Sequence, residues 1–212
     1  MSKKSRAKQQ KPPTPPKLVL PAEVQRAFEI GMLQVEQEAV WMWEWMNQQK
    51  SLCPYRPHIM EIGTNQGGFM WMMCRALEPK LAISVDVVNG AFSSGNVVVA
   101  KRTEALKECP VTWIEGSSFD PKVEARVKGV LGKEKLDLLV IDGDHRFPDV
   151  DMAIYGPLVR PGGWIMFHDI ADTPAHRDQK VQVPRLWRHL NGWKVELRAG
   201  APFGGIGLLR QA

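Results

Sequence analysis

Residues 58–69 read His-Ile-Met-Glu-Ile-Gly-Thr-Asn-Gln-Gly-Gly-Phe, and this stretch decides the fold. Its first part, His58–Ile62, is a short apolar run that predicts a buried strand. The glycines that follow allow the backbone to turn sharply and to approach a ligand without a Cβ in between. The next apolar segment, Phe69–Leu77, predicts a helix. A strand, a glycine-rich turn and a helix in this order predict a ligand site at the carboxyl edge of a parallel sheet.

The rest of the chain alternates short apolar runs with helical segments. The runs predicted as strands are His58–Ile62, Leu81–Val85, Val111–Ile114, Leu136–Ile141, Gly163–Phe167, Trp193–Leu197 and Gly205–Leu209. The fourth run is almost wholly apolar, which is typical of a strand covered by helices on both faces. This alternation predicts an α/β domain with a doubly wound, mostly parallel sheet. The last two strands have no helix between them, so we expect an antiparallel closing hairpin.

Charge and composition divide the chain into a tail and one domain. The chain has 28 Lys and Arg residues against 23 Asp and Glu, and residues 1–17 hold six of the basic residues and no acid. Four prolines and the near absence of apolar side chains predict that residues 1–20 are a disordered tail. Residues 21–212 have the length of a single domain. An apolar stripe from Val24 to Met46, at intervals of three and four, predicts one N-terminal helix over about residues 22–48.

Several broad classes of protein are disfavoured by composition. The apolar runs are too short to span a bilayer, and no apolar region follows the basic N-terminus as in a signal peptide. Three irregularly spaced cysteines predict free thiols in a reducing compartment. We therefore expect a cytoplasmic protein without a membrane partner. Nucleic acid could be contacted only through the basic tail, whose other interpretation is a solubilising segment, and a homo-oligomer stays open.

The glycine-rich turn and the end of the second strand predict a site for an adenosine-containing cofactor. Asp86 ends that strand, eighteen residues after Gly68, where a carboxylate can accept both hydroxyls of a ribose. The spacing Gly63-x-x-x-Gly67-Gly68 lacks the second glycine of the dinucleotide fingerprint Gly-x-Gly-x-x-Gly. An NAD-type oxidoreductase is therefore disfavoured, although it stays an alternative, as does a cofactor-binding protein without catalysis.

Five segments taken together carry a family resemblance. They are Glu-x-Gly-x-x-x-Gly-Gly from Glu61, Asp86, the run 116–120, Ile141–His145 and Pro157–Asp169. This combination resembles class I S-adenosylmethionine-dependent methyltransferases. More narrowly, it is similar to methyltransferase domain 24, the group with cephalosporin-cluster and macrolide-sugar O-methyltransferases. The resemblance covers roughly residues 55–210. It implies a Rossmann-like, seven-stranded sheet in the order 3-2-1-4-5-7-6, with strand seven antiparallel.

The resemblance also implies roles for individual residues. The methionine part of S-adenosyl-L-methionine would be held by Glu61, Gly63, Thr64, Asn65, Gly67 and Gly68. Asp86 would hold the ribose, Ser117 or Ser118 would lie near the adenine, and Asp142 would border the cofactor. In metal-dependent relatives an acid at the position of Asp142 and an acid pair ending strand five bind magnesium. The residue matching His145 is the proposed catalytic base in the macrolide-sugar members.

Methyl transfer to a hydroxyl requires alignment of the oxygen with the methyl group and removal of a proton. Asp142 and Asp169 follow strands four and five, which are expected to be neighbours, so they can converge on one divalent cation with His145 close by. His168 replaces an expected oxygen ligand by nitrogen, and imidazole suits manganese better than magnesium. Adjacent side chains alternate between the faces of a strand, so His168 either binds the ion or points away. In the plainer alternative, Asp142 binds loop amides and His145 is an ordinary loop histidine.

The sequence thus predicts an S-adenosylmethionine-dependent O-methyltransferase for a small hydroxylated acceptor, a sugar or glycoconjugate, with a Mg or Mn ion as second cofactor. The alternative enzyme is metal-independent and acts on another acceptor, including nucleic acid. Residues 89–95 and 171–182 are expected to be mobile lids that select the acceptor. Asp144, Asp149 and Asp151 are expected to face solvent or to cap the following helix.

Overall fold

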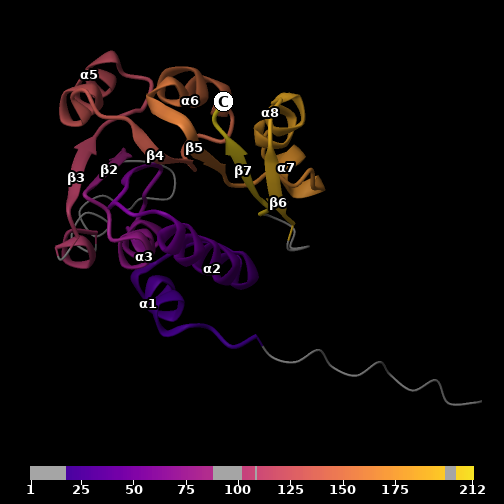
Figure 1. Cartoon of the computed structure of the whole chain (residues 1–212). Helices are drawn as coiled ribbons and strands as arrows, with labels where there is room; N and C mark the ends of the chain where they lie inside the picture. The colour runs from indigo at the N-terminus through magenta and orange to yellow at the C-terminus, as the bar shows by residue number, and fades with distance from the viewer. Residues whose placement is uncertain (1–17, 88–101, 108, 199–203) are drawn as a thin grey trace, which may run out of the picture.

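Seven strands form one sheet in the computed structural model, which describes residues 18–87, 102–107, 109–198 and 204–212. The strands are β1 (His58–Ile62), β2 (Leu81–Asp86), β3 (Val111–Glu115), β4 (Leu136–Ile141), β5 (Val159–Phe167), β6 (Lys194–Leu197) and β7 (Ile206–Arg210). Their order is β3-β2-β1-β4-β5-β7-β6 (Figure 1). Strands β1 to β5 pair in parallel, whereas β7 is antiparallel to both of its neighbours. The predicted fold class and strand order are confirmed.

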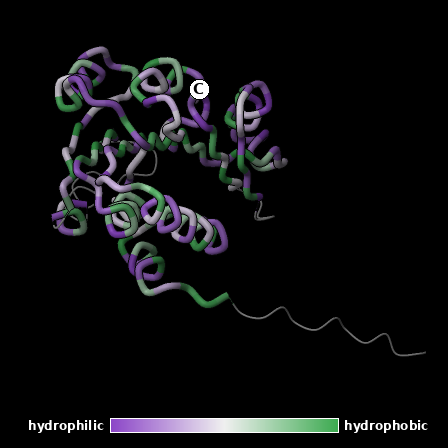
Figure 2. Tube along the Cα trace, in the orientation of Figure 1, coloured by the Kyte–Doolittle hydropathy of each residue, from purple (hydrophilic) through white to green (hydrophobic). Residues whose placement is uncertain are grey.

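Helices cover both faces of this sheet. They are α1 (Ala22–Ile30), α2 (Glu36–Leu52), α3 (Gly68–Leu77), α5 (Pro121–Leu131), α6 (Pro148–Tyr155), α7 (Pro174–Asp178), α8 (Val183–His189) and the 3₁₀ turn η1 (Gly156–Leu158), with residues 102–106 also helical. On β1, Ile59 faces the core beneath α1, α2 and α3, whereas Met60 faces the core beneath α5, α6 and α8. Figure 2 shows apolar residues gathered along the strands between these layers. Both faces of the central strands are therefore buried, as their continuous apolar runs predicted.

The predicted single helix over residues 22–48 is wrong, because two helices occupy this region. Helix α1 ends at Gly31, whose φ of +119° is a left-handed conformation that glycine adopts without a Cβ penalty. The chain then turns, and α2 begins at Glu36. The apolar stripe continued across the break because Met32, in the turn itself, is also buried. The apolar spacing therefore predicted which side chains are buried, but it did not indicate where α1 ends.

The turn after α1 packs directly on the start of α3. A Cβ built on Gly68 would lie 2.4 Å from the carbonyl oxygen of Ala27 and 2.6 Å from the backbone nitrogen of Met32. Backbone atoms cannot move aside as a flexible side chain can. Helix packing therefore requires glycine at position 68. The sequence pattern had indicated only that this glycine lets the backbone approach a ligand.

Two predicted features lie outside the described residues. They are the tail, for residues 1–17, and the loop 89–95. The other predicted lid, residues 171–182, contains the short helix α7, which begins with Thr173 accepting a hydrogen bond from the backbone N–H of His176. None of the helices in the described part of the chain has the length and apolar character that a membrane crossing requires.

Replacing Gly68 by Ala should destabilise the protein by roughly 1–3 kcal/mol or more, because the methyl group overlaps backbone atoms. Gly129 on α5 supplies the matched control, since a Cβ there would meet nothing within 4 Å. Gly129→Ala should stabilise the protein by about 0.5–1 kcal/mol through the higher helix propensity of alanine. Urea unfolding of both variants without cofactor measures the difference. Equal stability changes of the same sign would contradict the packing role of Gly68.

Candidate functional site

The predicted site residues lie at the carboxyl ends of the five parallel strands, β1 to β5. Two of these ends touch each other through their backbones. A Cβ on Gly63, which has a φ of +89°, would lie 2.1 Å from the carbonyl oxygen of Asp142. The N–H of Asp142 also donates to the carbonyl of Ile62 at 3.0 Å. The glycine-rich turn and the loop that carries Asp142 and His145 therefore form one continuous surface.

Asp86 organises the glycine-rich turn. Its carboxylate accepts hydrogen bonds from the backbone N–H groups of Asn65 and Val87, both at 2.6 Å. Asn65 has a φ of +49°, and its side-chain oxygen is buried without a hydrogen bond. Arg102 donates to the carbonyl of Asn65 at 2.6 Å, lies 3.6 Å from Asp86 and stacks over the ring of Trp113 at 3.6 Å. The predicted ribose acid and the glycine turn are thus held together by a buried guanidinium.

Glu61 is a buried carboxyl group that faces this surface. Its side chain is 1% exposed, and Oε2 has no hydrogen-bond partner. Burial and the nearby carboxylates of Asp142 and Asp86 raise the pKa of Glu61 well above its ordinary value. Three acidic side chains in one place favour a cationic ligand. The Thr64 hydroxyl pairs with that of Ser84 at 2.5 Å, and a hydrogen bond from Thr64 partly opposes the rise in the pKa of Glu61.

The loop after β3 places its two serines in different environments. Ser117 is exposed, and its hydroxyl accepts a hydrogen bond from the N–H of Phe119. Ser118 is buried, and its carbonyl accepts a hydrogen bond from the Tyr155 hydroxyl at 2.8 Å. Asp151 lies beside Ser118, and a Cβ built on Gly143 would be 3.5 Å from its carboxylate. This acid connects the β3 loop with the β4 loop.

The expectation that Asp151 faces solvent is wrong. Its side chain is fully buried, and neither carboxylate oxygen completes a hydrogen bond of good geometry. Burial, with smaller contributions from Asp144 and Asp149, raises the pKa of Asp151 to about 6. The sequence placed Asp151 in the first turn of a helix, where acids are common caps. It could not show that this turn faces the β3 loop.

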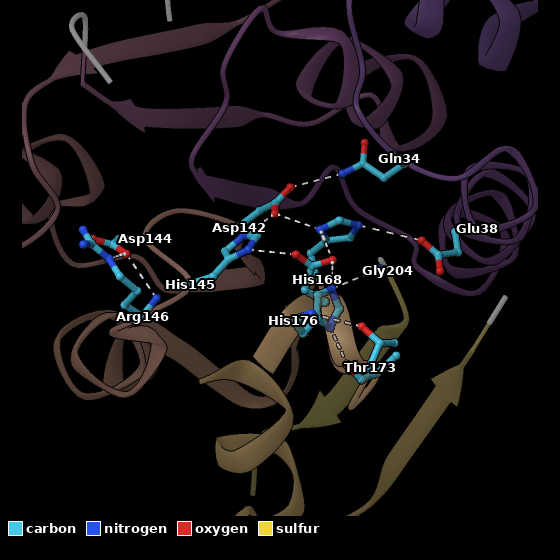
Figure 3. A network of polar contacts seen from close by, with 12 residues as sticks. Gln34, Glu38, Asp142, Asp144, His145, Arg146, His168, Thr173, His176 and Gly204 are labelled. Atoms are coloured by element: carbon cyan, nitrogen blue, oxygen red, sulfur yellow. Dashed lines mark hydrogen bonds and ion pairs between the residues drawn. The ribbon is translucent and has the colours of Figure 1, made fainter. Parts of the chain in front are cut away.

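Asp142, His145, His168 and Asp169 form the second group of site residues (Figure 3). His145 lies between two carboxylates, with Nε2 3.0 Å from Asp142 and Nδ1 2.8 Å from Asp169. Nδ1 of His168 lies 3.1 Å from Asp142 and 3.3 Å from Asp169. Strand β5 ends at Phe167, and Asp169 has a φ of +62°, so strand alternation no longer applies. His168 and Asp169 therefore reach the same cluster.

Mutual charge pairing dominates this cluster. Burial alone would lower the pKa of His145, but hydrogen bonds and attraction to Asp142 and Asp169 outweigh it and raise the pKa to about 10. His168 is raised well above its ordinary pKa in the same way, mainly by Asp142. The pKa values of Asp142 and Asp169 fall below the ordinary range, because the histidines outweigh the effect of burial. Pairing with these carboxylates therefore favours the protonated form of both imidazoles.

The cluster contains atoms that could bind a divalent cation. Among the described residues, one ligand atom each from Asp142, His145 and His168 lies within 4.8 Å of the other two. Both ring nitrogens of His168 and Oδ1 of Asp169 are buried without completing a hydrogen bond. A set of carboxylate oxygens and imidazole nitrogens suits manganese, iron or zinc better than magnesium.

Two further residues of this site, Gln34 and Glu38, were missed by sequence reasoning, and His176 was expected only as part of a lid over residues 171–182. Gln34, between α1 and α2, donates to Asp142 at 3.1 Å. Glu38 on α2 is fully buried, accepts from the N–H of Gly205 at 2.6 Å and lies 3.8 Å from His168 Nε2. His176 on α7 lies 3.4 Å from Asp169. For Glu38, the only signal in the sequence was its position as an acid within a helix that carries an apolar stripe. The same pattern fits an acid on the exposed face of that helix.

Asp151→Asn tests the buried acid between the β3 and β4 loops. A raised carboxyl pKa means that the folded state favours the protonated form, so stability is lost as pH rises from about 4 to about 6. The asparagine variant lacks this loss and should be more stable than the wild type at pH 8, by up to about 3 kcal/mol. The difference should nearly vanish near pH 4.5. Chemical unfolding at both pH values measures it.

Asp149→Asn is the control for this experiment, because Asp149 is an exposed acid in the same turn of α6. It should change stability little at either pH. An Asp151→Asn variant that is equally or less stable than the wild type at pH 8 would show that the carboxylate has a stabilising partner.

Comparison with known proteins agrees with this geometry. A family model described as a methyltransferase domain matches residues 60–170, just over half of the 212-residue chain. No curated protein sequence matches the chain. An O-methyltransferase from Bacillus cereus in complex with SAH is similar in structure, with a TM-score of 0.65 at 14% identity, covering 92% of this chain and 91% of that one.

Two other solved structures show how widely this fold is used. The O-methyltransferase TomG from Streptomyces achromogenes, involved in tomaymycin synthesis and in complex with SAM, has a TM-score of 0.59 at 17% identity over 90% of this chain and 87% of that one. An rRNA methylase from Streptococcus thermophilus has a TM-score of 0.56 at 9% identity over 86% and 100%. Identities this low show a shared fold and leave the acceptor unnamed.

The sheet order and the glycine turn beside Asp86 define a class I S-adenosylmethionine-dependent methyltransferase fold. The family match covers the strand, turn and loop segments that build this edge, and the chain belongs to the methyltransferase domain family. It is a methyltransferase that uses S-adenosyl-L-methionine.

Proposed function

We propose that this enzyme is an O-methyltransferase that methylates a hydroxyl of a small acceptor, a sugar or glycoconjugate. One observation carries the proposal: Asp142, His145, His168 and Asp169 converge directly beside the glycine turn. A hydroxyl must lose its proton as its oxygen is methylated, and this cluster supplies groups that can bind the oxygen and accept the proton. The structural similarity to two O-methyltransferases supports the same acceptor atom.

The residues of the glycine turn fit S-adenosyl-L-methionine. The cofactor supplies an electrophilic methyl group on a positively charged sulfur. Asp142 provides negative charge for the cationic part, and the unpartnered Oε2 of Glu61 can accept from an ammonium group, whose charge would offset the raised pKa of that carboxyl. Asp86 is positioned for the ribose hydroxyls, with Gly63, Asn65 and the first turn of α3 beside it. Ser117, Ser118 and Asp151 surround the position expected for the adenine.

A divalent cation fits the second group of residues. Asp142 and Asp169 would contribute oxygen, and His168 would contribute nitrogen through a ring that lacks a completed hydrogen bond. When bound, such an ion would supply Lewis acidity that lowers the pKa of an acceptor hydroxyl. Its charge would also offset the negative charge of Asp142 and Asp169 beside His145. The mixed donor set makes manganese a better choice than magnesium.

His145 is the proposed general base. Its Nε2 lies 3.0 Å from Asp142, so the ring is oriented by a residue of the same loop. Its Nδ1 lies 2.8 Å from Asp169, which holds the ring from the opposite side. The attraction of these two carboxylates raises the pKa of His145, so a cation bound to them would lower that pKa again and leave the imidazole able to accept a hydroxyl proton. Contact of the tail with nucleic acid and formation of a homo-oligomer stay predictions.

Asp86→Ala should reduce the affinity for S-adenosylhomocysteine by tens-fold or more. Removal of a charged group that bonds both ribose hydroxyls costs on the order of 2–3 kcal/mol. Calorimetry measures the change, and Glu115→Gln is the control, since Glu115 is the exposed acid paired with Asp86 in the β2–β3 register. The control should bind as the wild type does. Unchanged binding in Asp86→Ala would remove Asp86 from the cofactor site.

Asp142→Asn and Asp169→Asn should each weaken manganese binding and lower methyl transfer together, because each removes one negative charge from the ion. His145→Ala should retain manganese, while turnover falls by roughly 10² to 10⁴ if His145 is the base. Paramagnetic relaxation during manganese titration of the S-adenosylhomocysteine complex measures ion binding without knowledge of the acceptor. Asp144→Asn is the control, because Asp144 pairs with Arg146 in the same loop.

Absence of a bound ion in the wild type would overturn the metal-dependent mechanism. So would equal manganese binding in the wild type, Asp142→Asn and Asp169→Asn. A metal-independent methyltransferase would then be the better interpretation.

A further inference from the structure

A cationic cavity lies between α7 and α8, beside the candidate catalytic cluster. It has a volume of about 270 Å³. Its charged lining consists of Asp172, Arg177, Lys180, Arg185 and Arg188. Four of these side chains are positive and one is negative. The lining therefore has an excess of three positive charges, in a domain that is close to neutral outside its tail.

The cations around this cavity are arranged about a single acid. Asp172 binds Arg177 at 2.7 Å through one carboxylate oxygen and Arg188 at 2.8 Å through the other. These two guanidinium groups hold the pKa of Asp172 below its ordinary value. Lys180 and Arg185 have no side-chain hydrogen bond or ion pair with any residue that the structure describes. One acid thus orients two arginines, and two further cations remain to bind an anion.

The cavity is joined to the catalytic cluster by two of its lining residues. His176 lies 3.4 Å from Asp169. The backbone N–H of Gln182 donates to the carbonyl of His145 at 2.7 Å. Figure 3 shows His176 next to His168, on the side of the cluster away from Gln34. The cavity and the cluster therefore share a wall, which places an anionic group in the cavity on the same side of the sheet edge as the residues proposed to act on the hydroxyl.

The backbone that carries these cations is held by its own hydrogen bonds. Thr173 caps α7, and the N–H of Val181 donates to the carbonyl of His176 at 2.9 Å. His176 itself is 1% exposed. The segment between the cap and Gln182 therefore presents its cations from a hydrogen-bonded backbone.

We propose that this cavity binds the phosphate group of the methyl acceptor, so that the acceptor is a phosphorylated hydroxyl compound such as a sugar phosphate. The proposal rests on the proposed O-methyltransferase function and names its substrate class. A phosphate monoester carries about −1.5 to −2 charges at pH 7, which suits an excess of three cations better than a single carboxylate does. Guanidinium groups bind phosphate oxygens in pairs, and several arginines around one cavity favour this anion.

The test is a titration of the S-adenosylhomocysteine complex with inorganic phosphate, glucose 6-phosphate, glucuronate and glucose, followed by NMR. Both phosphates should bind, glucuronate should bind more weakly, and glucose should not bind. Lys180→Gln/Arg185→Gln should weaken phosphate binding by about tenfold, the amount expected for two exposed charge contacts. Lys122→Gln/Arg126→Gln on α5 removes the same charge elsewhere and should bind phosphate as the wild type does. Higher salt should weaken binding in the wild type.

Three results would overturn the proposal: no phosphate binding, equal weakening in both double variants, or glucuronate binding as tight as that of glucose 6-phosphate. Cofactor affinity and manganese relaxation are measured on the same variants, and neither involves Lys180 or Arg185. If both are intact while phosphate fails to bind, this proposal alone is wrong. If the wild type binds neither the cofactor nor manganese, the proposed function is overturned instead.

Discussion

The backbones of Gly63 and Asp142 meet at the carboxyl ends of the central strands β1 and β4, and both halves of the site depend on this contact. A Cβ at position 63 would lie 2.1 Å from the carbonyl oxygen of Asp142, so the contact requires glycine. It brings the glycine turn against the loop that carries Asp142 and His145. In the proposed function, the cofactor turn and the groups that act on the acceptor are neighbours because these strand ends are close.

Buried charges impose the second constraint on this molecule. Asp142 and Asp169 lie among His145 and His168, and removal of one partner from this partly buried cluster would leave a charge without compensation. Such a cluster costs stability unless its members satisfy one another. This compensation is incomplete at His168 and Asp169, where buried polar atoms lack a completed hydrogen bond. A bound cation would complete it, so the same atoms that weaken the fold define the proposed metal site.

The N-terminal helices link fold and site in a way that their own sequence conceals. The left-handed Gly31 ends α1 and lets α2 return across the sheet, and Gly68 lets the turn pack on α3. Gln34 and Glu38, on either side of the start of α2, thereby reach Asp142 and His168. A segment interpreted from its apolar stripe as a covering helix also contacts the cluster that contains Asp142 and His168. Opposite it, α7 and α8 close the cluster with a cationic cavity.

Much of the fold was determined by the sequence alone. Apolar runs and glycine positions are local properties, and they predicted the seven strands and the edge at which the site lies. Together with the family resemblance they also predicted the strand order and the convergence of Asp142 with Asp169. Only the tertiary structure decided that Glu38 and Asp151 are buried, that His168 turns toward the cluster, and that four cations surround one cavity. An acid within a helix has the same local sequence pattern whether it faces water or another loop. Its burial depends on contacts with residues distant in the chain, and packing alone determines those contacts.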